Sequence, residues 1–316
     1  MTKPIFCIGE ALIDMICTDR GQSLREGEHY LRKAGGAPTN VAAAIAALGG
    51  DVHLAGKIGN DPFGEHIAEL VESFGVDTQW LLRTSEAFTT FAFVSLMPNG
   101  ERDFFFNRGA DALLNVHELE QLDVRQYSIA HFGSATAFLP GPLQDTYLQT
   151  WEQCRQSGLF LSFDPNYRHL LYRDRQADFI RQSWHFLKTC HFFKLSDEEA
   201  QLLTGQKDVK QAADQLLRDC HAVFAITIGK EGALVGCNGQ LQTVPAIPVV
   251  PVDTTGAGDA FVGALLFQLQ QQQIPANDLE AWCRIVANAN RAGARTCEFM
   301  GAMEAFRHLN KSILTA

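Results

Sequence analysis

The stretch Asp253-Thr254-Thr255-Gly256-Ala257-Gly258-Asp259-Ala260-Phe261 follows a β-like run over residues 247–252 and precedes an apolar helical run. Two glycines and an alanine let the backbone turn here with little side-chain bulk. Their N–H groups are then expected to point out of a helix N-terminus, where free amides and the helix dipole bind anions. The stretch therefore predicts a strand-to-helix turn with an anion site formed by Gly256, Ala257 and Gly258.

Asp259 lies in the first turn of that predicted helix. An acid at this position can simply stabilise the positive end of the helix. An acid beside an anion site is also placed to accept a proton from a hydroxyl group that attacks a phosphate. Residue chemistry alone leaves both interpretations open.

Elsewhere in the chain, short apolar runs alternate with helical patterns. The strand candidates are residues 5–9, 52–58, 128–132, 159–163, 192–195 and 223–227. The helix candidates are residues 38–48, 62–75, 143–157, 175–187, 208–220, 258–271 and 279–297. This alternation predicts βαβ units and an α/β fold with a mostly parallel sheet.

One part of the chain breaks the alternation. Residues 90–97 and 102–106 are strand-like, and Pro98-Asn99-Gly100 between them is a turn signal. We expect a small antiparallel insertion, a candidate lid, that pairs with the polar segment before Lys33. Because the edge of such a sheet is exposed, we also expect a homodimer in which a partner's lid covers it.

The composition of the 316-residue chain is that of a globular protein, with 46% apolar and 20% charged residues. Its formal charge of −10 argues against nucleic acid as a partner. The eight cysteines form no CxxC pair, so the usual zinc and redox spacings are absent. No apolar run reaches membrane-spanning length, and the first ten residues lack a signal-peptide pattern. These features predict a soluble cytoplasmic protein without a membrane partner.

A second glycine-rich segment, Gly35-Gly36-Ala37-Pro38-Thr39-Asn40, opens the first predicted helix. The Gly-Gly turn brings the backbone close to a ligand, and Asn40 offers two donors and an acceptor. The same residues also make an ordinary helix start, with proline in the first turn and asparagine as a local cap. Both interpretations stay open for this segment alone.

Three further polar segments come directly after predicted strands, where open α/β sheets form their ligand crevice. Residues 164–168, DPNYR, suit a polyhydroxylated or anionic ligand. Residues 194–199, KLSDEE, carry acids that either cap the next helix or serve a hydrated metal. Residues 227–232, TIGKEG, either approach a nucleotide or turn a hairpin.

Several motifs of other enzyme classes are missing. There is no G-x-x-x-x-G-K-[ST], which excludes a P-loop enzyme, and no G-x-G-x-x-G after a strand, which makes a dinucleotide-binding oxidoreductase improbable. There is also no H-E-x-x-H, no G-x-S-x-G and no protein-kinase signature set.

Taken together and in this order, the motifs resemble those of the PfkB carbohydrate kinases, the ribokinase-like family, over nearly the whole chain. Residues 35–40, continued through residues 49–64, look like the first family signature, and residues 253–263 look like the second. The resemblance implies one kinase domain over residues 1–316, a three-layer α/β/α fold with a mostly parallel central sheet. It also implies a small β lid from insertions at about residues 14–33 and 88–110.

The resemblance also implies a role for each site residue. It assigns Asp259 the part of catalytic base beside a Gly256–Ala257–Gly258 anion hole. It assigns to the sugar site Asp14, Gly35, Gly36, Asn40, Arg108, Asn166 and Arg168. It assigns to the nucleotide site Lys194, Thr227, Gly229, Gly232 and Asn288. Glu199 would hold Mg²⁺ through water, and Asp253 would border a monovalent cation such as K⁺.

Within the family, the details are most similar to bacterial fructokinases, on residues 35–40, 100–102, 163–168 and 194–199. The resemblance therefore implies an ATP-dependent sugar kinase that converts D-fructose to fructose 6-phosphate. The alternatives are a 2-keto-3-deoxygluconate kinase or riboside kinase of the same family. A non-catalytic sugar-sensing protein on the same fold is the alternative from a different class.

Overall fold

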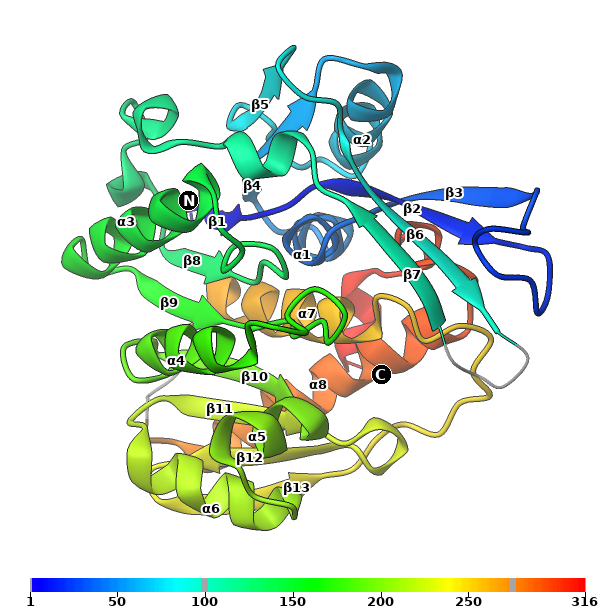
Figure 1. The fold of residues 1–316 in the computed structure, drawn as a ribbon. Helices are drawn as coiled ribbons and strands as arrows, with labels where there is room; N and C mark the ends of the chain where they lie inside the picture. Colours follow the sequence, from blue (N-terminus) through cyan, green and yellow to red (C-terminus); the bar gives the residue numbers. More distant parts are fainter. Residues whose placement is uncertain (1, 98–101, 273–276, 316) are drawn as a thin grey trace.

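A nine-stranded sheet forms the centre of the molecule (Figure 1). The computed structural model describes residues 2–97, 102–272 and 277–315. In spatial order the strands are β13 (Gln240–Val244), β12 (Ala233–Cys237), β11 (Val223–Thr227), β10 (Phe192–Ser196), β9 (Phe160–Phe163), β8 (Ile129–Phe132), β1 (Ile5–Ile8), β4 (Val52–Gly59) and β5 (Leu81–Thr84). The strands from β11 to β5 pair in parallel, and only β12 and β13 pair antiparallel, so the prediction of a mostly parallel sheet is confirmed.

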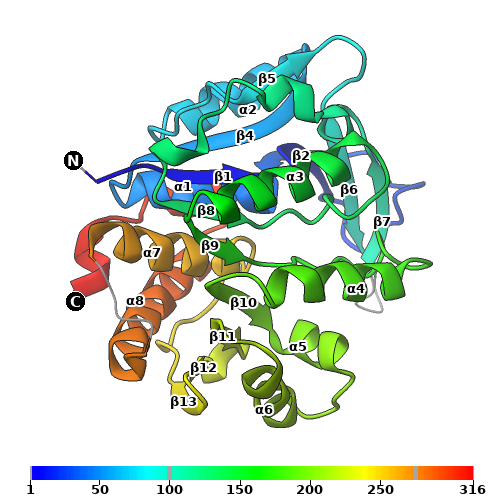
Figure 2. The same cartoon turned by 90° about the vertical axis from the view of Figure 1, so that its left-hand side faces the viewer.

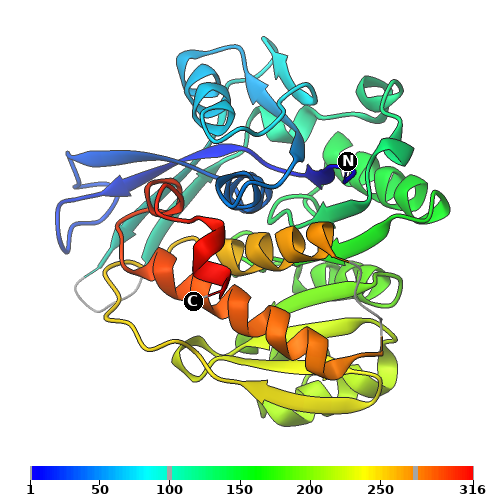
Figure 3. The ribbon, with the colours of Figure 1, turned by 180° about the vertical axis from the view of Figure 1, so that it is seen from behind.

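Helices cover both faces of this sheet (Figure 2). One layer holds α1 (Ala37–Ala47), α2 (Pro62–Glu72), α7 (Ala257–Gln271), α8 (Leu279–Cys297) and α9 (Ala302–Phe306). The other holds α3 (Pro142–Gln156), α4 (Gln176–Leu187), α5 (Asp197–Thr204) and α6 (Val209–Asp219). Figure 3 shows α7 and α8 side by side on the back of the molecule.

Strand β1 shows why two cores form. Its residues alternate between the faces, so Ile5 and Cys7 join the core under α1 and α7, while Phe6 and Ile8 join the core under α3 and α4. All four side chains are fully buried. Because helices cover both faces of the sheet, all four residues of the strand are apolar, as is typical of the strands of a parallel sheet. The predicted three-layer α/β/α architecture is confirmed.

A second, four-stranded sheet, which corresponds to the candidate lid and is called the lid here, projects from the main one (Figure 1). Its spatial order is β3 (Tyr30–Gly35), β2 (Leu12–Cys17), β6 (Thr90–Leu96) and β7 (Arg102–Asn107). As predicted, the hairpin of β6 and β7 pairs with the segment before Lys33. The hairpin itself is antiparallel, as predicted, whereas β2 and β6 run in parallel. The two strands follow β1 and β5, which are themselves parallel members of the main sheet, so both extend from it in the same direction. The predicted turn at Pro98-Asn99-Gly100 lies outside the described residues.

The segment before α7 is also different from the prediction. Residues 247–252 were expected to be β-like, but no strand forms between β13 and α7. Pro245, Pro248 and Pro251 recur at every third position here, and each lacks the N–H group that a sheet ladder needs. The turn at Gly256 is therefore approached from an irregular segment and not from a strand. Among the described residues, no helix has the length and apolar character that a membrane span requires.

Candidate active site

The turn before α7 is held in place by the carboxylate of Asp253. Its Oδ1 atom accepts hydrogen bonds from the Thr255 N–H (3.0 Å) and hydroxyl (2.7 Å), and its Oδ2 atom accepts from the Gly301 N–H (2.8 Å). These donors hold the pKa of Asp253 below its usual value, although burial opposes the shift. The residue is therefore an anion that organises the turn.

Gly256 is the N-cap of α7 and has a left-handed backbone with φ 79°. A Cβ atom at this position would overlap the Cβ atom of Ala302 at the start of α9. Glycine is thus required here for its conformation and for space. The helix then opens with Ala257 and Gly258, so the predicted anion hole coincides with the N-terminal end of a 15-residue helix.

Asp259 lies in the first turn of α7 and meets Asn40 from α1. The Asn40 Nδ2 atom donates to Asp259 Oδ2 at 2.8 Å. The two helices approach closely because both are lined with small residues, and a Cβ atom on Gly263 would lie only 2.7 Å from the Cβ atom of Ala44. Burial raises the pKa of Asp259, against the opposing effects of Asn40, Arg168 and Lys194. The Oδ1 atom of Asn40 is buried and has no hydrogen-bond partner among the described residues.

Asp14 on lid strand β2 belongs to the same site. Burial raises its pKa to about 6; the charge of Arg168 opposes this shift, whereas the charges of Glu10 and Asp259 add to it. A Cβ atom on Gly35, in the neighbouring strand, would overlap the Asp14 carboxylate. The structure therefore brings together Asp14, Arg168 and Asp259, which come from three distant parts of the sequence.

Glu10 is a buried acid that the sequence analysis did not single out. Its carboxylate accepts from the Ala37 N–H (3.0 Å), the Ala135 N–H (3.3 Å) and the Ser134 hydroxyl (2.5 Å). Burial raises its pKa, and these donors oppose the shift. It ties the start of α1 to the loop after β8. The available signal was an acidic residue two positions after the strand that ends at Ile8.

A buried ion pair lies below the start of α7. The Lys194 Nζ atom lies 3.2 Å from Asp164 Oδ2, and the two side chains are 9% and 1% exposed. The ammonium group is also 3.4 Å from the position that a Cβ atom on Gly258 would take. Burial raises the pKa of Asp164 to about 7, although Lys194 opposes this shift. Both residues belong to polar segments that the sequence places after predicted strands, but their ion pair becomes visible only once β9 and β10 are adjacent.

Replacing Lys194 by methionine is expected to lower the free energy of unfolding by about 3–5 kcal/mol at pH 8, because it leaves Asp164 buried without its partner. The cost should shrink as the pH falls, since Asp164 has a raised pKa and then binds a proton. Urea unfolding at several pH values measures this. Adding Asp164→Asn to the variant removes the unpaired charge and should restore part of the stability. An equal loss at pH 5 and pH 8 would contradict the argument.

The structure gives three other predicted sugar-site residues local partners. Arg108 donates to Asp111 (3.3 Å) and to the carbonyl groups of Pro140 (2.7 Å) and Thr136 (3.2 Å). Asn166 has a positive φ of 49° and donates to the Gly133 carbonyl group at 2.8 Å, which fixes the loop after β9. Gly36 has φ 106°, and a Cβ atom there would overlap the Glu10 carbonyl group.

The predicted nucleotide-site residues are spread over four elements: β10 with Lys194, the end of β11, the turn after it, and α8. The Thr227 hydroxyl at the end of β11 donates to the Leu195 carbonyl group at 3.3 Å. Gly229 has φ 48° with open space around it, whereas a Cβ atom on Gly232 would overlap the Val244 carbonyl group. The Asn288 amide is engaged within the helix layer, since it donates to Gln268 (2.8 Å) and accepts from Arg291 (2.7 Å). Asn288 therefore has a clear packing role between α7 and α8.

The donor set fits a metal ion only indirectly. Among the described residues, no group of three or more His, Cys, Asp or Glu side chains is arranged to hold a metal. Glu199 accepts from the Tyr167 and Ser196 N–H groups, both at 2.7 Å, and so caps α5. Its carboxylate keeps further lone pairs. Such a site fits Mg²⁺, which usually retains waters and is held largely by substrate phosphates.

Comparisons with known proteins agree on one family. Residues 2–307 match the family described as pfkB family carbohydrate kinase. Fructokinase-1 of Zea mays is 35% identical over 304 residues, covering 95% of this chain and 93% of the relative. Fructokinase-2 of Solanum lycopersicum is 34% identical over 306 residues, covering 95% and 92%.

Solved structures lead to the same family. Fructokinase from Xylella fastidiosa with bound ATP has a TM-score of 0.84 at 30% identity, with 100% of this chain and 98% of that chain covered. Fructokinase from Vibrio cholerae O395, with bound fructose, ADP and calcium ion, has a TM-score of 0.81 at 30% identity, with 99% and 98% covered. Aminoimidazole riboside kinase from Salmonella enterica has a TM-score of 0.81 at 28% identity, with 99% and 98% covered.

Proposed function

The chain belongs to the pfkB family of carbohydrate kinases, and from that premise we propose that it transfers the γ-phosphoryl group of ATP to D-fructose, giving fructose 6-phosphate. The observation that carries the proposal is the hydrogen bond between Asn40 and Asp259 beside the N-terminus of α7, with Asp14 facing the same site. Fructokinases are among the similar proteins both in the curated sequences and in the solved structures. One of these structures has ATP bound and another has fructose bound.

In the proposed reaction, Asp14 and Asn40 orient the sugar through its hydroxyl groups. Asp259 takes the proton of the 6-hydroxyl group as the oxygen attacks the γ-phosphorus in line. The new O–P bond forms while the bond from the γ-phosphorus to the β,γ-bridging oxygen breaks, and ADP leaves with that electron pair. The amides at Gly256 to Gly258 and the ammonium group of Lys194 lie where the phosphoryl charge develops, which is the main way such transfers are catalysed.

The nucleotide would lie along residues 227–232, and Mg²⁺ bound with it would screen the phosphate charge. We propose that Glu199 holds the water shell of this ion and that a monovalent cation such as K⁺ lies near Asp253. Asp253 already accepts three hydrogen bonds, which keep it ionised and suited to a cation.

The alternatives of the same family are less well supported. Among the solved structures, aminoimidazole riboside kinase is 28% identical to this chain and two fructokinases are 30% identical, while curated fructokinases reach 34–35%. A 2-keto-3-deoxygluconate kinase would use Arg168 to meet the substrate carboxylate. A non-catalytic sugar sensor has no need of a buried base at Asp259.

A substrate panel tests the proposal. The protein is given ATP, Mg²⁺ and either D-fructose, 2-keto-3-deoxygluconate, a riboside or D-glucose, and ADP release is measured. We expect the highest kcat/KM with D-fructose and, by ³¹P NMR, a phosphate on carbon 6. A higher kcat/KM with another acceptor would identify that acceptor, and not fructose, as the preferred substrate. Binding of a sugar without any turnover would instead favour the sensor.

Replacing Asp14 by asparagine is expected to raise the KM for fructose by about 10- to 100-fold, because a charge-assisted hydrogen bond contributes about 1.5–3 kcal/mol. The kcat value should change far less, since Asp14 holds the sugar and does not take the proton. Met15→Leu, on the opposite face of the same strand, is the matched control. A loss confined to kcat would contradict this role.

We also propose that two copies pair through the lid. Ile16, Leu31 and Leu96 are exposed apolar side chains, and the strand register places them on one face of this sheet. Light scattering after gel filtration measures the mass in solution. A monomer at all concentrations would refute the pairing.

A further inference from the structure

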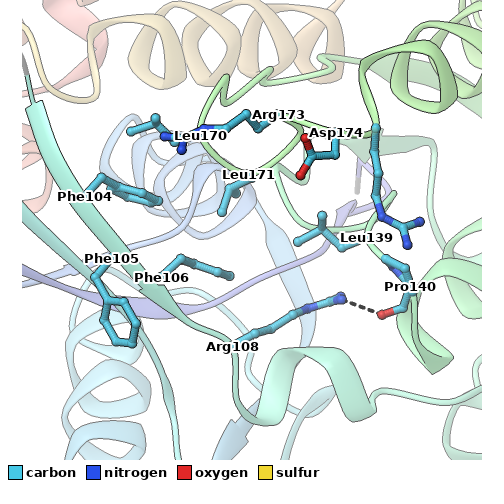
Figure 4. Close-up of a pocket in the computed structure, with 11 residues that line it drawn as sticks. Phe104, Phe105, Phe106, Arg108, Leu139, Pro140, Leu170, Leu171, Arg173 and Asp174 are labelled. Atoms are coloured by element: carbon cyan, nitrogen blue, oxygen red, sulfur yellow. Dashed lines mark hydrogen bonds between the residues drawn. The ribbon is translucent and has the colours of Figure 1, made fainter.

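The two edge strands of the lid meet the main body of the molecule differently. At one edge, β7 borders the open cavity of about 590 Å³ shown in Figure 4, which Arg108 lines and which belongs to the proposed substrate cleft. At the other edge, β3 lies against α9. There the ammonium group of Lys33 on β3 pairs with the carboxylate of Glu304 on α9. The proposed reaction makes no use of this ion pair, whose members are 271 positions apart in the sequence.

On the lid, Lys33 is the direct neighbour of Asp14. The two residues are opposite each other in the pairing of β2 with β3, so their side chains project from the same face of the lid. Residues paired in this way have Cβ atoms about 4.5–5.5 Å apart. Because two paired strands move as one unit, any tilt of the lid that moves Asp14 relative to a sugar also moves Lys33 relative to α9.

On the main body, the ion pair lies directly on Gly301, the N-cap of α9. A Cβ atom at this position would lie 2.5 Å from Glu304 Oε2 and 3.3 Å from the Cε atom of the paired lysine. The Gly301 N–H donates to Asp253, which holds the turn before α7. The next residue, Ala302, lies against Gly256 of the same turn. Helix α9 therefore supports the proposed anion-binding turn at two points.

The surroundings of the ion pair keep its two side chains in a fixed geometry. Fully exposed pairs contribute little, because water and salt screen the charges and two long side chains must be ordered. Here the Lys33 side chain is only 18% exposed, while that of Glu304 is 50% exposed. Both side chains also pack on the bare backbone of Gly301. The pair is thus suited to transmit a displacement from the lid to α9.

We propose that Lys33 and Glu304 couple the two halves of the active site, so that a sugar at Asp14 and nucleotide phosphates at the turn before α7 raise each other's affinity. The inference rests on the proposed function, which makes Asp14 a sugar ligand and the turn an anion hole. A sugar that fixes the lid through Asp14 also fixes Lys33 against α9, and α9 then holds the turn in place. Both members of the pair are positioning residues, because they act through Asp14 and Gly301.

The coupling is measured by calorimetry on the full-length protein. The Kd of β,γ-methylene-ATP with Mg²⁺, an analogue that cannot transfer its γ-phosphoryl group, is determined with and without a saturating acceptor. The acceptor is the one that the substrate panel identifies, which we expect to be D-fructose. The sugar should lower the Kd of the nucleotide by about fivefold or more, since coupled sites usually differ by about 5- to 150-fold. The nucleotide should lower the Kd of the sugar by the same factor, because such coupling is reciprocal.

Variants then assign the coupling to the ion pair. Lys33→Gln and Glu304→Gln should each reduce the factor to below about twofold, and the double variant should match the single ones, because all three remove the same pair. Lys33→Arg keeps the charge and should keep most of the coupling. Arg155→Gln breaks an exposed ion pair with Glu152 on α3, in the other helix layer, and is the matched control with the wild-type factor.

A ratio of affinities separates coupling from a merely structural role, since a loss of stability alone does not change it. The wild-type factor should fall as salt is added, because Glu304 is half exposed. Binding of both ligands without coupling, or the full factor in Lys33→Gln and Glu304→Gln, would overturn the inference and leave the kinase assignment intact. Binding of nucleotide but of no sugar would overturn the proposed function, and the coupling with it.

Discussion

Asp259→Asn is expected to lower kcat by about 10²–10⁴-fold, the usual contribution of general acid–base catalysis. Asparagine keeps the size of the side chain and an oxygen that can accept the hydrogen bond from Asn40. The sugar site should therefore remain assembled, and the affinity for fructose, measured by calorimetry, should stay within a few-fold of wild type. A coupled assay for ADP gives kcat.

The alternative role of Asp259 is to stabilise the start of α7 as a helix N-terminal acid. Asp145 is the matched control, because it is an exposed acid in the first turn of α3, whose N-cap Gly141 also has a positive φ. Asp145→Asn removes a helix-end charge without touching the site, so its kcat should equal that of wild type. If Asp259→Asn lowers stability as Asp145→Asn does but keeps most of its turnover, Asp259 is a helix-stabilising residue only.

The pH dependence of the wild-type protein provides an independent check on the base. Since burial raises the pKa of Asp259, the carboxylate becomes protonated at a higher pH than an ordinary aspartate. Turnover should therefore disappear as the pH falls, with an apparent pKa above the usual aspartate value of about 3.9. Protonation of Asp14, whose pKa is raised to about 6, should weaken sugar binding and lower kcat/KM as the pH falls through that value.

The elements that sequence could predict are those with a strong local pattern. Strand β1 and the helix pattern ending at Cys297 are recognisable because burial on both faces, or on one helix face, leaves a regular apolar spacing. The segment 247–252 misleads because its isoleucine and valines have the spacing of a strand, while its prolines prevent the ladder. The apolar spacing there favours a strand, but proline residues cannot donate the hydrogen bonds of a sheet, so no strand forms.

The site, too, contains residues that the sequence could predict and residues that it could not. Gly256, which has a left-handed backbone, is visible in sequence because its conformation requires glycine. The role of Glu10 and the pairing of Asp164 with Lys194 are not visible, because the partners come from segments far along the chain, and only the strand order makes them neighbours. Asn40 and Asp259 are 219 residues apart and meet because small residues let α1 and α7 approach. Pairings of this kind are properties of topology, and no local spacing encodes them.

Gly256→Ala should damage both the stability of the protein and its turnover. Alanine pays about 1–2 kcal/mol for a left-handed backbone, and the overlap with Ala302 adds about 1–3 kcal/mol, as overpacking does. Ala302 follows Gly301, whose N–H group holds Asp253, so a shift of α9 also loosens the turn before the helix. We expect the free energy of unfolding to fall by about 2–5 kcal/mol in urea titrations.

The same shift should reduce kcat by about 10²–10³-fold, the cost of losing one well-placed donor to a developing negative charge. Gly205→Ala separates the two causes, because Gly205 has nearly the same φ, 73°, but nothing within 4 Å of an added Cβ atom. Gly205→Ala should lower the free energy of unfolding only by the cost of a left-handed alanine, about 1–2 kcal/mol, and should leave kcat unchanged. Kinetics are measured at a temperature where both variants are folded by circular dichroism. If the two alanine variants lose equal stability and keep equal turnover, the contact with Ala302 does not position the anion hole, and the fixed geometry of the Gly256 turn is not what the reaction requires.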